Sequence, residues 1–127
     1  MKNNFFIVAI DFDGTITDEK NSKGFPFTGE VRKEAIEGIK KLKENGCKLI
    51  LWTSRYDWAY KEALDICSEH NIEFDAYNRN LDKIKSSQKI YADFYIDDKS
   101  TIEEIDWEKI VNHILKLKYE KEKKYNK

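Results

Sequence analysis

Apolar residues fall in short runs that alternate along the chain with stretches of helical spacing. The runs cover residues 5–10, 48–52, 74–77 and 92–96, and they are rich in residues that favour strands. The first two are continuous or nearly so, which indicates strands covered on both faces, as in a parallel sheet. The pattern therefore predicts four buried, parallel strands.

Between these runs, apolar residues recur every three or four positions among charged ones, which is the spacing of an amphipathic helix. This spacing predicts a helix that begins near Val31 and stops at Gly46, a second that ends near Asn71, and a third that starts near Asp106. Strands that alternate with helices predict an α/β fold with a doubly wound, Rossmann-like parallel sheet. We expect helices on both faces and ligands at the carboxyl ends of the strands.

Length and composition narrow the class of protein. The 127 residues fit a single domain, which we expect to span residues 1–118, whereas the charged segment 119–127 is expected to fray. The net charge of −1 lacks the basic excess of a general nucleic-acid binder. Cys47 and Cys67 show no metal-ligand spacing, and no apolar stretch is long enough to span a bilayer. These features predict a cytoplasmic protein without general nucleic-acid or membrane binding.

Carboxylates gather where the predicted strands end. Asp11 and Asp13 follow the first strand, and Asp97 and Asp98 follow the fourth. Because the carboxyl ends of parallel strands share one edge of a sheet, we expect these side chains to converge there. Their mutual repulsion requires a bound cation, and Mg²⁺ is suited to the place because it binds both carboxylates and phosphate oxygens. All of these aspartates are therefore candidate metal ligands.

The spacing of Asp11 and Asp13 places both carboxylates on the same side of an extended backbone. In this arrangement Asp11 is suited to attack phosphorus, while Asp13 protonates the leaving oxygen and then activates water. Gly14 allows a sharp turn and keeps side-chain bulk away from a phosphate, and Thr15 completes the same candidate phosphate-binding loop. The pattern predicts a magnesium-dependent phosphotransferase with Asp11 as its nucleophile.

Other polar residues at this edge are candidates for substrate binding. Thr53 and Ser54 lie where the second strand meets a helix amino terminus, which suits a phosphate oxygen. Arg55 is expected either to clamp a substrate anion or to form a surface ion pair with Asp57. Asn78, after the third strand, is expected either to line the rim of the site or to form a plain turn.

A lysine is expected to complete the neutralisation of the phosphate charge. Lys89 is favoured because it lies just before the fourth strand, and Lys83 and Lys85 are its competitors.

These motifs resemble those of the haloacid dehalogenase superfamily, in its magnesium-dependent phosphatase branch. The resemblance implies that Asp11 is the nucleophile and Asp13 the general acid and base, and that Thr53 and Lys89 hold the phosphoryl group. It further implies that Mg²⁺ is bound by Asp11, by the backbone carbonyl of Asp13, and by one of two adjacent aspartates. The residues that carry the resemblance, in the order of the family's motifs, are Asp11-Phe12-Asp13-Gly14-Thr15, Thr53, Lys89 and Asp97-Asp98.

Phosphatases of this superfamily often carry a cap domain over the site, and neither interval between the motifs has room for one here. The resemblance therefore implies a capless hydrolase with an open site. Either its phosphorylated substrate is large, or a neighbouring subunit of a homo-oligomer covers the site.

Two other functions fit parts of the pattern. A receiver-type phosphoacceptor domain also combines acids, a hydroxyl and a lysine on a parallel sheet. Its phosphorylated aspartate ends the third strand, where this chain has Tyr77 and Asn78. A catalytically silent binding module would keep the fold for a partner, but the complete set of acids favours an enzyme.

Overall fold

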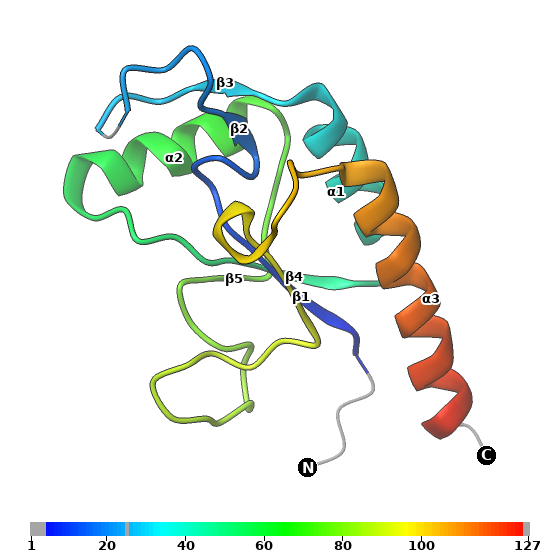
Figure 1. The fold of residues 1–127 in the computed structure, drawn as a ribbon. Helices are drawn as coiled ribbons and strands as arrows, with labels where there is room; N and C mark the ends of the chain where they lie inside the picture. Colours follow the sequence, from blue (N-terminus) through cyan, green and yellow to red (C-terminus); the bar gives the residue numbers. More distant parts are fainter. Residues whose placement is uncertain (1–4, 25, 126–127) are drawn as a thin grey trace.

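The computed structural model describes residues 5–24 and 26–125. Its centre is a parallel sheet (Figure 1). The four strands of this sheet stand in the order β5, β4, β1, β6. These strands are β1 (Ile7–Ile10), β4 (Lys48–Leu51), β5 (Ala76–Tyr77) and β6 (Phe94–Ile96). Each apolar run of the sequence contains one strand, and the predicted parallel α/β sheet is confirmed. No cap domain is present among the described residues.

Three helices pack on one face of this sheet: α1 (Lys33–Glu44), α2 (Asp57–Glu69) and α3 (Trp107–Tyr125). All three contribute to the same apolar cluster as Val8 and Ile10 of β1. The chain passes from β1 through α1 to β4, and from β4 through α2 to β5, in one direction across the sheet. Right-handed crossovers in one direction place both helices on the same face.

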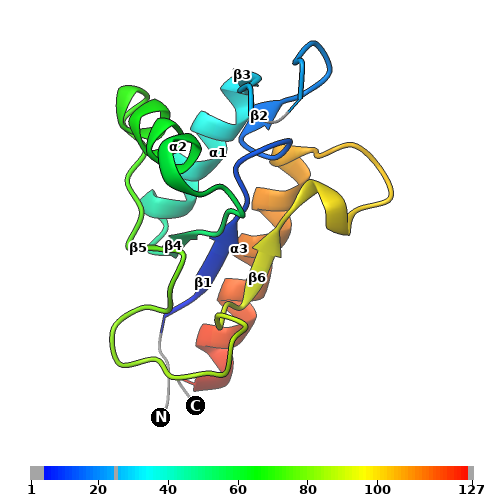
Figure 2. The same ribbon diagram turned by 90° about the vertical axis from the view of Figure 1, so that its left-hand side faces the viewer.

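The other face of the sheet is covered by a loop, which corrects the expectation of helices on both faces. Ile7 and Ala9 pack there with Ile90 and Ala92 from the connection between β5 and β6. Residues 78–93 of this connection contain no helix, and Figure 2 shows them as a long loop. The segment is polar and lysine-rich, and a φ of 70° at Lys83 is incompatible with a continuing helix.

A small antiparallel hairpin lies on the carboxyl-end side of β1 (Figure 2). It pairs β2 (Thr17–Asp18) with β3 (Glu30–Val31). Residues 19–24 and 26–29 join these strands, and we call them the hairpin loop. A short 3₁₀ helix, η1 (Asp98–Ser100), follows β6 at the same end of the sheet. The polar loops of the chain are thus gathered at the carboxyl edge.

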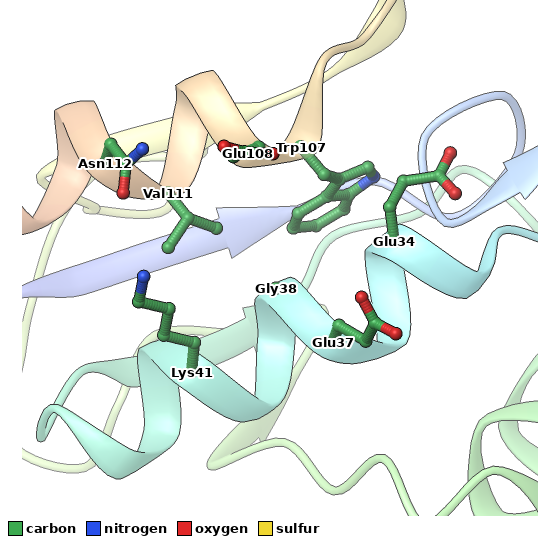
Figure 3. A pocket seen from close by; sticks show the side chains of 8 residues that line it. All are labelled: Glu34, Glu37, Gly38, Lys41, Trp107, Glu108, Val111 and Asn112. Carbon is green, nitrogen blue, oxygen red and sulfur yellow. The ribbon is translucent and has the colours of Figure 1, made fainter.

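The carboxyl-terminal helix α3 lies beside α1. Gly38 makes this approach possible, because a Cβ at that position would stand 2.8 Å from Cε3 of Trp107 (Figure 3). The expected fraying of residues 119–127 is corrected for residues 119–125, which continue α3, whereas residues 126–127 lie outside the described residues. Lys121 anchors this end, since its Nζ donates to the carbonyl of Phe5 at 2.7 Å and to Oδ1 of Asp93 at 3.0 Å. Within the described ranges, no helix is long and apolar enough to cross a membrane.

Candidate active site

Three carboxylates meet at the carboxyl ends of two neighbouring strands. Asp11 follows β1, and Asp97 and Asp98 follow β6. One oxygen from each lies within 4.8 Å of the others, and we call these three residues the acid cluster. Burial, together with the charges of Asp97 and Asp98, raises the pKa of Asp11 to about 7. An all-oxygen donor set that is destabilised by its own charge fits a hard cation such as Mg²⁺.

The loop after β1, residues 11–15, is tied to the acid cluster through Thr15. The Thr15 hydroxyl accepts the backbone N–H of Asp98 at 2.9 Å and lies 3.3 Å from Oδ2 of Asp11. The carbonyl of Thr15 accepts a hydrogen bond from Nε1 of Trp107 at 2.9 Å. The buried Thr15 hydroxyl thus holds Asp11 and Asp98 in position relative to each other. The predicted role of Thr15 in substrate binding stays a prediction, because this residue does not line the cavity described below.

Gly14 fits this loop because it has a φ of 81° and faces the Asp98 carboxylate, with which a Cβ would overlap. We expect Gly14→Ala to lower the free energy of unfolding by about 2 kcal/mol or more, from backbone strain plus the displaced carboxylate. Chemical denaturation measures this change. Gly46→Ala is the matched control, since its φ is 84° and its Cβ would meet only the end of Lys118 at 3.8 Å. Equal losses in the two variants would contradict the assigned overlap with Asp98.

The Asp13 carboxylate lies outside the acid cluster and is paired with Arg55. Nε and Nη2 of Arg55 donate to the two oxygens of Asp13, each at 2.7 Å. The Arg55 side chain is 1% exposed and is not part of the cavity lining, so it is placed neither as a surface ion pair nor as a direct substrate clamp. If Asp13 contributes to a metal site, its backbone carbonyl is the group left to do so.

A cavity of about 360 Å³ opens at this edge of the sheet. Thr53 and Ser54 line it together with acids of both motifs. Asn78 does not line it but holds the backbone of Thr53, accepting the Thr53 N–H at 2.8 Å and donating to the Thr53 carbonyl at 2.9 Å. The lining consists of Asp11, Asp13, Trp52, Thr53, Ser54, Asp97 and Lys99.

The lysine at this cavity is Lys99, which the sequence analysis missed. The signal for Lys99 in the sequence was its position directly after Asp97-Asp98. Trp52 also lines the cavity, and its signal was its position at the end of the second apolar run. Lys89 lies with its Nζ 4.9 Å from the ring centroid of Tyr95, and neither Lys89, Lys83 nor Lys85 belongs to the lining. The phosphate-binding role of Lys89 therefore stays a prediction.

A second, smaller cavity of about 180 Å³ lies between α1 and α3 (Figure 3). Its walls include Glu34, Glu37 and Glu108 around Trp107. None of the candidate site residues lines it. The chemistry of the acid cluster belongs to the larger cavity.

A sequence model of the haloacid dehalogenase-like hydrolases matches residues 8–125, nearly the whole chain. The chain belongs to this family. A solved structure of a conserved protein from Bacteroides thetaiotaomicron is similar as well. The two chains are 32% identical, the match covers 88% of this chain and 91% of the other, and the TM-score is 0.77. No curated protein matches the chain significantly.

Membership in the haloacid dehalogenase-like hydrolases confirms the resemblance seen in the sequence. Asp11 begins the sequence motif on which the resemblance rests, and the structure adds a cluster of aspartates around it. This chain thus combines the fold of the family with a cluster of aspartates at one edge of its sheet.

Proposed function

We propose that this protein is a magnesium-dependent phosphohydrolase that transfers a phosphoryl group from a phosphate monoester to Asp11. The acid cluster carries the proposal, because in a haloacid dehalogenase-like chain it places Asp97 and Asp98 beside Asp11, and Asp11 and Asp97 line a cavity. Asp13 and Thr53 line the same cavity, so a nucleophile, a second acid and a hydroxyl face one space.

The proposed reaction has two steps. In the first, an Asp11 carboxylate oxygen bonds to phosphorus, the bond from phosphorus to the leaving oxygen breaks, and Asp13 gives that oxygen a proton. In the second, water attacks the aspartyl-phosphate, Asp13 takes the proton of this water, and the bond from phosphorus to Asp11 breaks. Inorganic phosphate is released, Asp11 is again a carboxylate, and Asp13 is again in the protonated form in which it entered the first step.

The other groups of the site bind the phosphoryl group and neutralise its charge. The Thr53 hydroxyl oxygen accepts the Arg55 N–H at 3.2 Å, which leaves its hydrogen for a phosphate oxygen. Lys99 supplies positive charge in the lining, and Lys89 is the alternative lysine. Mg²⁺ held by Asp11, Asp97 and Asp98 would keep Asp11 ionised and offset the charge of the phosphoryl oxygens. Since no cap is present among the described residues, the substrate is large or a second subunit covers the cavity.

The test is phosphate release from a panel of aryl, sugar, nucleotide and peptide phosphates, with Mg²⁺ and with a chelator. We expect turnover of at least the aryl phosphate, and its loss when the chelator removes the metal. A folded protein that binds Mg²⁺ and turns over no ester in the panel would contradict the proposal. That result would favour the catalytically silent binding module.

A further inference from the structure

The Asp13 carboxylate is bound by the side chain of a buried arginine. We propose that Arg55 is the positioning residue that fixes the Asp13 carboxyl group for proton transfer to the leaving oxygen and from the attacking water. This inference rests on the proposed phosphohydrolase function and adds to it a residue that acts without touching the substrate.

The contact between the two side chains is bidentate, and we call these two hydrogen bonds the fork. Nε of Arg55 donates to Oδ2 of Asp13 and Nη2 donates to Oδ1, both at 2.7 Å. Parallel bonds from a planar guanidinium fix the plane of the carboxylate as well as its distance. Arg55 is 1% exposed, whereas the Asp13 side chain is 30% exposed and lines the cavity. The arginine therefore reaches the substrate only through Asp13.

Arg55 is itself held by several other groups. Its Nη1 donates to the carbonyl of Ala59 in α2 at 3.0 Å. Its Nη2 also donates to the hydroxyl of Thr28 in the hairpin loop at 3.0 Å. Its guanidinium carbon lies 5.1 Å from the ring centroid of Phe12, in the loop that carries Asp13. The guanidinium thus sets the Asp13 carboxylate relative to the hairpin loop, α2 and the loop after β1 at once.

Such an arrangement matters because proton transfer depends on position. A general acid must stand within about 3 Å of the atom that it protonates, and a displacement of about 1 Å costs on the order of a hundredfold in rate. The hydrogen bonds of the loop hold its backbone, since the carbonyl of Phe12 accepts the N–H of Ile16 at 3.0 Å, but they do not hold the Asp13 side chain. The fork restrains that side chain.

The test compares two esters whose leaving groups differ in their need for a proton. Arg55→Lys keeps the charge but cannot form the fork. With phenyl phosphate at saturating Mg²⁺, we expect kcat to fall at least about tenfold more than with 4-nitrophenyl phosphate, whose leaving group departs without a proton. KM for both esters and the Mg²⁺ affinity measured by calorimetry are expected to stay near their wild-type values.

Three further variants sharpen the result. Asp13→Asn should show the same preference for the 4-nitrophenyl ester, and Asp13→Asn combined with Arg55→Lys should lose no more than Asp13→Asn alone. Arg79→Lys, a matched change in an exposed arginine that pairs with Asp82, should leave both esters unaffected. If Arg55→Lys does not fold, Thr28→Val removes only the hydroxyl that holds Nη2, and it should show the same selectivity to a smaller degree.

Equal losses on the two esters would overturn the positioning role while leaving the phosphohydrolase in place. A rise in KM alone would likewise overturn it, because that result would mean direct substrate contact. A wild-type protein that is inactive on both esters would overturn the proposed function and this inference with it.

Discussion

Asp11→Asn is expected to lower the turnover of phenyl phosphate by about a thousandfold or more, since an amide cannot form the acyl-phosphate. The variant should nevertheless be well folded. Asparagine keeps the shape of the side chain and cannot acquire the negative charge that Asp97 and Asp98 repel, in a cluster whose oxygens lie within 4.8 Å of one another. Steady-state turnover, acid-quench trapping of the phosphorylated chain and circular dichroism measure the three parts of this expectation.

The control for this variant is Asp18→Asn, which changes an aspartate on β2 outside the cavity. Asp18 accepts the backbone N–H of Lys20 at 2.9 Å, a bond that an asparagine oxygen also accepts. This control should turn over phenyl phosphate at the wild-type rate. Phosphate release by Asp11→Asn at that same rate would rule out Asp11 as the nucleophile.

The metal-free protein is expected to lose stability as the pH rises from about 4 to about 7. Burial and neighbouring charge raise the pKa of Asp11 from 3.8 to about 7. Within this window the unfolded chain has already released the Asp11 proton, whereas the folded protein retains it. Because the folded state binds more protons, its free energy of unfolding falls with rising pH, by a few kcal/mol at most from this group.

Mg²⁺ should reverse this loss, because it binds the ionised acid cluster of the folded protein. The stabilisation by Mg²⁺ is therefore expected to be larger at pH 8 than at pH 5. Urea denaturation at several pH values, with Mg²⁺ and with a chelator, measures both effects. Asp11→Asn is the control, and its metal-free stability should depend less on pH. Wild-type and variant curves of equal slope would show that Asp11 does not titrate as described.

The position of the acids at the carboxyl ends of the strands was predictable, because each acid directly follows a buried strand in the sequence. Ile10 precedes Asp11 and Ile96 precedes Asp97, so an apolar run fixes where each carboxylate emerges. Parallel pairing of β1 with β6 then brings the two ends together. Local pattern and covalent connection were sufficient for this part of the site.

The pairing of Asp13 with Arg55 could not be predicted in the same way. It joins residues 42 positions apart, and it depends on how the loops after β1 and β4 face each other. The sequence offered Asp57 as a nearer partner for Arg55, whereas the folded chain buries the guanidinium against Asp13. Side-chain direction across two loops is set by tertiary packing, about which a pattern of residue types says little.

The loop over the second face and the length of α3 were missed for a related reason. Both depend on single contacts that composition does not reveal. Lys121 lies in a charged segment that predicts fraying, yet its ammonium binds Asp93 at 3.0 Å with both side chains largely buried. Tyr95 holds the loop on the other face, because its hydroxyl donates a hydrogen bond to the carbonyl of Ile90 at 2.7 Å.

The hydrogen bonds of Thr15 have a consequence for the order in which the molecule is assembled. The Thr15 hydroxyl accepts its hydrogen bond from Asp98, 83 positions later in the chain, and the Thr15 carbonyl accepts one from Trp107, 92 positions later. During synthesis from the amino terminus, β1 and the loop after it leave the ribosome long before either partner exists. The last hydrogen bond of the loop that carries Asp11 and Asp13 therefore forms only when α3 docks, so a nascent chain that lacks this helix would hold the loop incompletely.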